Sequence, residues 1–198
     1  MNDPARPNHF AQFGVEPRPW IDQEQLKERF LQLSAEVHPD KTLDKPAAER
    51  AFTELNSSYN VLRNTRARLL HLLELCGAPG KEHVQDVPDA ALDFFAEVAA
   101  VTKSVEALLR KKTAADSPML KVQLMSESLA QLEKVQEIQD RIRAKIEAVE
   151  TGLAQLSLDW PPPHAESGLK ALREAAAALG FLDRWNSQLH ERAARLTF

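Results

Sequence analysis

Two apolar series at helical spacing, joined by a short polar segment, constrain the N-terminal part of this chain more than any other feature. Their members recur every three or four residues: Leu26, Phe30, Leu33 and Val37 before the segment, and Ala48, Phe52, Leu55, Tyr59 and Leu62 after it. Such spacing places one apolar stripe on one face of a helix. Because only about ten residues join the two patterns, we expect an antiparallel helical hairpin.

The joining segment contains the tetrad His38-Pro39-Asp40-Lys41. Pro39 cannot continue the preceding helix and favours extended geometry at His38. We therefore expect the tetrad in a loop at one end of the hairpin, where side chains can meet a partner. Asp40, fixed in such a loop, is suited to pair with an arginine of that partner.

This arrangement resembles the J-domain, the module through which co-chaperones stimulate the ATPase of DnaK-type chaperones. The resemblance extends to the neighbourhood of residue 75 and rests on the tetrad, both helical patterns, and the runs 9–15 and 55–62. Residues 34–37 depart from the basic face that the family usually carries before the tetrad. The resemblance implies that the chaperone is bound by His38, Pro39, Asp40, Lys41, Lys27 and Arg29.

Composition favours helix along the whole chain. Hydrophobic residues make up 43% and charged residues 27%, which is typical of a globular protein. Only 6 glycines interrupt long stretches of good helix formers, and the period-two alternation of strands does not stand out. We therefore expect an all-α fold.

Charge and cysteine content exclude several classes of protein. Of the net charge of −4, residues 1–76 contribute −1 (10 basic, 11 acidic) and the remainder −3 (15 basic, 18 acidic). Neither part has the basic excess that nucleic-acid binding requires. The single Cys76 cannot form an internal disulfide, and no apolar run approaches the length of about eighteen residues that a membrane span needs. We expect a cytoplasmic protein that binds neither nucleic acid nor membrane.

The C-terminal part contains three further helical patterns. Pro79 and Gly80 mark a boundary, so we expect a J-domain at residues 1–78 and a second domain at 86–198. Its first helix should cover Pro88 to Lys112 and its last Glu166 to Leu196. The middle helix should turn one apolar side inward, formed by Val122, Met125, Leu129, Leu132, Ile142, Ile146, Val149 and Leu153. Short connections favour an antiparallel three-helix bundle, with an extended coiled coil as the alternative.

Motifs of catalysis and cofactor binding do not occur in the sequence. The 6 histidines form no metal-binding spacing, and no glycine-rich phosphate loop is present. His38 and Asp40 could be read as an acid–base pair, but no third group is placed to orient them. We therefore expect that the protein binds no metal and no cofactor and has no enzymatic activity of its own. We expect it instead to activate the ATPase of a partner.

The absence of a glycine/phenylalanine-rich linker and of zinc-binding cysteine repeats narrows the resemblance to HscB, the co-chaperone family of iron–sulfur cluster assembly. The stretches that carry it are Phe10–Val15, Arg68–Gly77 and Gly180–Trp185. This resemblance implies an HscA-type chaperone and an IscU-type scaffold protein as partners. It also implies that the scaffold is bound by Phe94, Phe95, Val98 and Phe181.

Two features of this second site depart from simple expectation. The family's charged run after Glu97 is replaced here by small and apolar residues. Adjacent residues of a helix cannot both face the core, so at least one of Phe94 and Phe95 must be partly exposed or bridge domains. The alternative function is a general J-domain co-chaperone with another client, or with weak homodimerisation through its C-terminal bundle.

Overall fold

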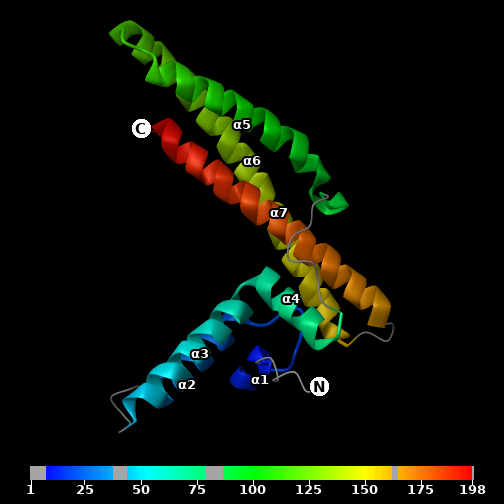
Figure 1. Ribbon diagram of the computed structural model, residues 1–198. Coiled ribbons are helices and arrows are strands. Elements are labelled where there is room, and N and C mark those ends of the chain that lie inside the picture. The colour runs from blue at the N-terminus through cyan, green and yellow to red at the C-terminus, as the bar shows by residue number, and fades with distance from the viewer. Residues whose placement is uncertain (1–7, 38–43, 79–86, 162–164, 198) are drawn as a thin grey trace. The chain divides into compact units, whose positions relative to one another are not determined.

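A computed structural model describes residues 8–37, 44–78, 87–161 and 165–197 of the chain (Figure 1). These residues form helices and connecting segments, with no strand among them. The helices are α1 (His9–Phe13), α2 (Gln23–Glu36), α3 (Lys45–Arg63), α4 (Thr65–Leu75), the short 3-10 helix η2 (Asp89–Ala91), α5 (Leu92–Thr113), α6 (Pro118–Leu158) and α7 (Ala165–Thr197). The all-α fold expected from the sequence is confirmed.

Local side-chain caps explain where the N-terminal helices begin. The Asp22 carboxylate accepts hydrogen bonds from the backbone N–H groups of Glu24 and Gln25, which otherwise lack partners in the first turn of α2. Asp44 and Asn64 cap α3 and α4 in the same way. Gly14 ends α1 with a φ of 65°, a conformation that glycine adopts without steric cost.

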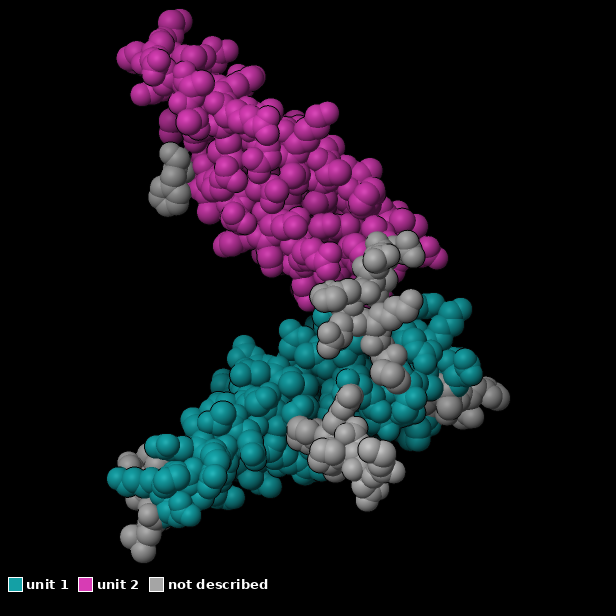
Figure 2. Space-filling model, in the orientation of Figure 1, with its two compact units in different colours: residues 1–82, 150–176 teal, residues 83–149, 177–198 magenta. Residues whose placement is uncertain are grey.

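Spatial contacts divide the chain into two compact units (Figure 2). Unit 1 comprises residues 1–82 and 150–176, and unit 2 comprises residues 83–149 and 177–198. Helices α6 and α7 therefore contribute residues to both units. The domain ranges expected from the sequence, 1–78 and 86–198, stay a prediction.

The hairpin of α2 and α3 forms one side of unit 1. Leu26 of α2 and Leu55 of α3 are buried, and Phe30 stacks on Tyr59 with ring centroids 4.3 Å apart. Phe13 of α1 lies on the same tyrosine ring at 6.4 Å. The apolar stripes read from the sequence thus meet along the hairpin.

Truncating Leu55 to alanine should lower the free energy of unfolding of unit 1 by about 3 kcal/mol, because it leaves a cavity in a packed interface. Urea denaturation followed by circular dichroism measures the change. Leu31→Ala serves as the matched control, since Leu31 lies exposed on α2. It should cost less than about 0.5 kcal/mol. Equal effects at the two sites would show that the helix phases are wrong.

The core of unit 2 is built from α5, α6 and α7, which lie side by side (Figure 1). Its buried residues include Val98, Val101, Val105 and Leu108 of α5, Leu124, Val135, Ile138 and Ile142 of α6, and Leu182, Trp185, Leu189 and Leu196 of α7. This is the helical bundle expected for the C-terminal part.

The inward side expected for α6 is wrong over its first turns. Val122, Met125 and Leu129 are exposed, whereas Leu124 and Ile142 are buried. The ten residues from Leu132 to Ile142 rotate a helix to about 80° short of three full turns. The series read from the sequence therefore joins two different faces of one helix.

Candidate partner-binding sites

The first candidate site is the exposed face of α2 in unit 1. Lys27 and Arg29 are both exposed there. The Lys27 ammonium lies 3.8 Å from a carboxylate oxygen of Glu24, and the Arg29 guanidinium donates to the side-chain oxygen of Gln32 at 3.3 Å. The face thus carries mixed charge. The tetrad residues His38, Pro39, Asp40 and Lys41 lie outside the described residues.

A cluster of polar side chains joins α1 to α3 and α4, and so connects α1 to the hairpin. Ser58 accepts a hydrogen bond from Nδ1 of His9 at 2.7 Å, because its own hydroxyl donates to the Gln12 side chain. The backbone N–H of His9 donates to Nε2 of His71 at 3.2 Å, and the two imidazole rings lie 4.4 Å apart. His71 also stacks on Phe10 at 5.6 Å.

Both imidazoles of this cluster favour the neutral form. Burial lowers the pKa of His9 below 6.5, against a smaller opposing effect of Glu74. Burial, and next the charge of His9, lowers the pKa of His71, again against Glu74. A protonated His71 could not accept the hydrogen bond from the His9 backbone, which agrees with the lowered pKa of His71.

Unit 1 should therefore lose stability on mild acidification. As the pH falls, these two histidines take up protons near pH 6.5 in the unfolded chain but only at lower pH in the folded chain. Proton binding therefore stabilises the unfolded state relative to the folded state. The free energy of unfolding should be level above about pH 7.5 and fall as the pH drops through about 6.5. Urea denaturation at pH values from about 7.5 to about 5.5 measures this change in the free energy of unfolding. His71→Gln should flatten the slope, and an unchanged slope would contradict the assignment.

Arg68 is the buried cation that ties α4 to the segment before α2. Its side chain is 1% exposed. It donates to the carbonyl oxygens of Pro19 at 3.1 Å and Leu62 at 2.6 Å, and to the Thr65 hydroxyl at 3.4 Å. Burial lowers its pKa to about 10, while the charge of Glu150 partly opposes the shift. Thr65 in turn donates to the Glu150 carboxylate at 2.8 Å, which brings the last part of α6 into the same network.

The second candidate site lies in unit 2, where its four expected residues differ in burial. Phe94, Val98 and Phe181 are buried in the core, whereas Phe95 is 55% exposed. The ring of Phe95 lies 6.4 Å from that of Trp185, which in turn lies 5.5 Å from Phe181. Of the adjacent pair that cannot share one face, Phe95 is the residue that faces outward.

Charged groups border this aromatic cluster, and sequence reasoning missed them. Arg141 of α6 forms a two-pronged ion pair with Glu97, at 2.5 and 3.0 Å, and its guanidinium lies 5.4 Å from the Phe94 ring centroid. The hydrogen bond to Arg141 lowers the pKa of Glu97. Arg184 covers the Phe181 ring at 5.3 Å. Arg184 follows Phe181 by three residues, a helical spacing that could have suggested the contact, but nothing local links Arg141 to α5.

Residues 8–71 match the family model of the DnaJ domain. The chain thus contains a J-domain over these residues. A co-chaperone protein HscB homologue of Acinetobacter baylyi is 38% identical over 68 residues, and homologues from two Acinetobacter baumannii strains are 37% identical over the same length. Each alignment covers 34% of this chain, and the chain spans only 40% of each relative's length.

The fold is similar to that of a solved HscB protein. The crystal structure of human co-chaperone HscB matches over 98% of this chain and 83% of its own, with a TM-score of 0.55 and 20% identity. HscB from Vibrio cholerae matches over 92% of this chain and 99% of its own, at 24% identity and a TM-score of 0.45. The human protein thus shares the architecture of a J-domain with a C-terminal helical bundle, and the chain resembles HscB.

Among the described residues, no helix is both long and apolar enough to cross a membrane. No group of three or more His, Cys, Asp or Glu side chains gathers in these ranges as a metal site would require. The expectation that the chain has no reaction of its own stays a prediction.

Proposed function

We propose that this chain is a cytoplasmic co-chaperone whose J-domain stimulates the ATPase of a DnaK- or HscA-type chaperone. The observation that carries the proposal is the DnaJ match at residues 8–71, which spans both hairpin helices and the tetrad between them. In this proposal His38, Pro39, Asp40 and Lys41 contact the chaperone. Lys27 and Arg29, exposed on α2, add electrostatic attraction.

The mechanism follows from the rigidity of the hairpin. Helices α2 and α3 are held together by buried leucines and by the stack of Phe30 on Tyr59, so the segment that joins them begins and ends on packed helices. Binding through a segment anchored in this way costs less ordering entropy than binding through a free peptide. An Asp40 carboxylate presented there can form a charge-assisted pair with an arginine of the chaperone.

Single-turnover ATP hydrolysis by the DnaK-type and HscA-type chaperones of the same organism tests this function. Addition of the full chain should accelerate hydrolysis by at least one of them. No acceleration of either chaperone would overturn the co-chaperone proposal.

We also propose that the bundle carries an IscU-type scaffold protein to that chaperone. The resemblance to HscB homologues motivates this client, and the exposed Phe95 supplies an aromatic anchor on a rigid helix. Phe94, Val98 and Phe181 would mainly position the exposed residues of the site, because their own side chains are buried. The Glu97–Arg141 pair offers polar contacts at the edge of the site.

Phe95→Ala should weaken scaffold binding at least fivefold, which corresponds to about 1 kcal/mol. Calorimetric titration of the full chain with the scaffold of the same organism measures it. Leu158→Ala is the matched control, because Leu158 is also an exposed apolar residue but lies on α6 within unit 1. Equal affinity of all three proteins would remove Phe95 from the site. No binding by the wild-type chain would favour a general J-domain co-chaperone with another client or with self-association.

A further inference from the structure

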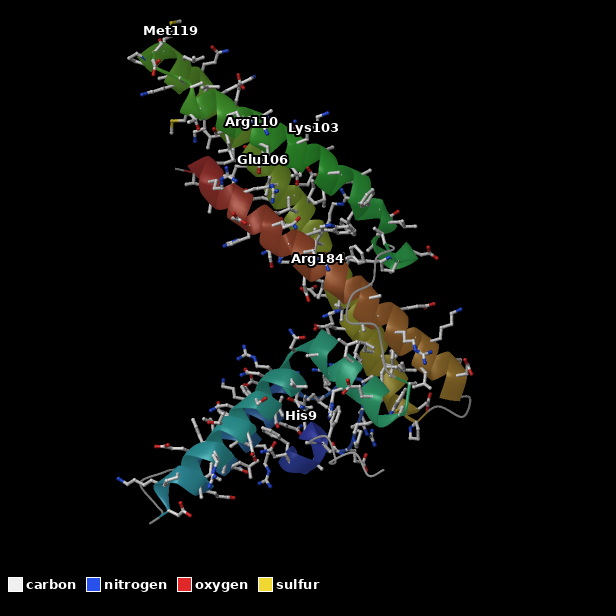
Figure 3. All side chains as sticks on the ribbon, in the orientation of Figure 1. His9, Lys103, Glu106, Arg110, Met119 and Arg184 are labelled. Carbon is white, nitrogen blue, oxygen red and sulfur yellow. The ribbon has the colours of Figure 1, made fainter. Side chains whose placement is uncertain are left out.

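The first turns of α6 expose an apolar stripe separate from the one that forms the core. Val122, Met125 and Leu129 are 72%, 65% and 55% exposed, and Leu132 is half-buried beside them. Their spacing of three, four and three is that of the contact seam of a coiled coil. We call these four residues the α6 seam. Nearby, Met119 projects from the end where α5 and α6 meet (Figure 3).

The seam lies beside the last turn of α7, because Leu196 and Thr197 line the same groove as Met125, Leu129 and Leu132. Figure 1 shows α5 and α6 continuing past the end of α7 within unit 2. Leu124, within the same turns, and Val135 and Ile138, farther along α6, are buried in the three-helix core. The seam therefore lies on a second face of α6, and a helix with two apolar faces typically packs against a partner on each.

A groove of about 490 Å³ is lined by three of the four seam residues, and Val122 lies outside its lining. Its walls include Met125, Leu129 and Leu132 of α6 and Leu196 of α7. A groove between two helices has the shape that accepts a further helix in the manner of a bundle.

The charge of the groove is one-sided. Lys112 and Lys121 contribute to its lining, and no carboxylate does so among the described residues. The Lys112 ammonium is held at the groove by donating to the Leu196 carbonyl at 3.0 Å, an acceptor without a formal charge. The nearby ion pair of Lys111 with Glu127 lies outside the lining residues. The groove is thus apolar along its floor and basic at its rim.

We propose that this groove binds an amphipathic, acidic helix of a partner protein. Apolar side chains of that helix pack on the α6 seam, and carboxylates on its flanks pair with Lys112 and Lys121. A second copy of this chain fits less well, because a two-fold contact would bring the same basic rim against itself. This inference concerns unit 2 alone and does not depend on the J-domain function.

The probe is a three-heptad helical peptide with leucine at its a and d positions and glutamate at its e and g positions. Fluorescence anisotropy with the full chain should show saturable binding that weakens as salt is raised. The same peptide with lysine at its e and g positions should bind at least tenfold more weakly. No saturable binding of the acidic peptide, or equal binding of both peptides, would overturn the proposal.

Two pairs of variants locate the contact. Leu129→Glu should weaken binding of the acidic peptide at least tenfold, whereas the same change at exposed Leu158 of α6 should leave it unaltered. Lys121→Glu should weaken it several-fold, whereas Lys134→Glu should not, because Lys134 lies outside the groove lining. Circular dichroism verifies that all four variants are folded. Equal effects within either pair would contradict the assignment.

Two other occupants are distinguished by independent measurements. Sedimentation equilibrium of the wild-type chain should show a monomer, and a dimer that Leu129→Glu dissolves would assign the seam to a second copy. Vesicles of mixed neutral and anionic phospholipid should not retain the chain. Retention that Leu129→Glu abolishes would assign the seam to a membrane surface and overturn the proposal.

Discussion

Arg68→Met should lower the free energy of unfolding of unit 1 by about 3–5 kcal/mol, the range typical when a buried charged network loses one member. Methionine keeps most of the side-chain volume, so the loss comes from polar groups rather than from a cavity. The carbonyl oxygens of Pro19 and Leu62 would remain buried without their donor. Each such unsatisfied group costs about 1–3 kcal/mol. The variant also no longer has to bury a charged guanidinium, which offsets only part of the destabilisation from these unsatisfied carbonyl oxygens.

Urea denaturation followed by far-ultraviolet circular dichroism measures the effect. Arg68→Lys should not restore stability, because one ammonium cannot reach the three acceptors that the planar guanidinium spans. Arg63→Met is the matched control, since Arg63 is exposed and its guanidinium lies 5.6 Å from the Tyr59 ring centroid. It should cost less than about 1 kcal/mol. Similar losses for Arg63→Met and Arg68→Met would refute a special role for the buried arginine.

His38→Gln is expected to abolish stimulation of the chaperone ATPase while leaving the fold unchanged. This prediction follows from the proposed function and from the position of His38 in the segment between α2 and α3. The hairpin itself is held by residues such as Leu26 and Leu55, so a change between its helices should remove little packing energy. Single-turnover ATP hydrolysis with the full chain measures the loss.

His190→Gln provides the matched control, because it makes the same chemical change at an exposed histidine of α7. It should stimulate the chaperone as the wild type does. Superimposable circular dichroism spectra and melting curves verify that His38→Gln is folded. Full stimulation by the folded His38→Gln protein would disprove the role of the tetrad.

Much of the fold was determined by the sequence through short-range physics. Asp22 begins α2 because its carboxylate reaches backbone N–H groups two and three residues away, within one turn. The helical spacing of Leu26 and Phe30 before the tetrad, and of Leu55 and Tyr59 after it, determined which faces meet in the hairpin. The same periodicity required that Phe94 and Phe95 do not both face the core. Such inferences succeed because cause and effect lie within a few residues.

Tertiary structure alone decided which residues from distant segments meet. Arg141 lies 44 positions from Glu97 along the chain, yet the two form an ion pair beside Phe94. Arg68 looked like one polar residue in a leucine-rich helix, and only its acceptors on Pro19 and Leu62 explain its burial. Which stripe of α6 faces inward also depended on which helices pack against it, since an apolar residue is buried only if another element covers it. Spacing predicts the faces of a helix, but packing chooses among them.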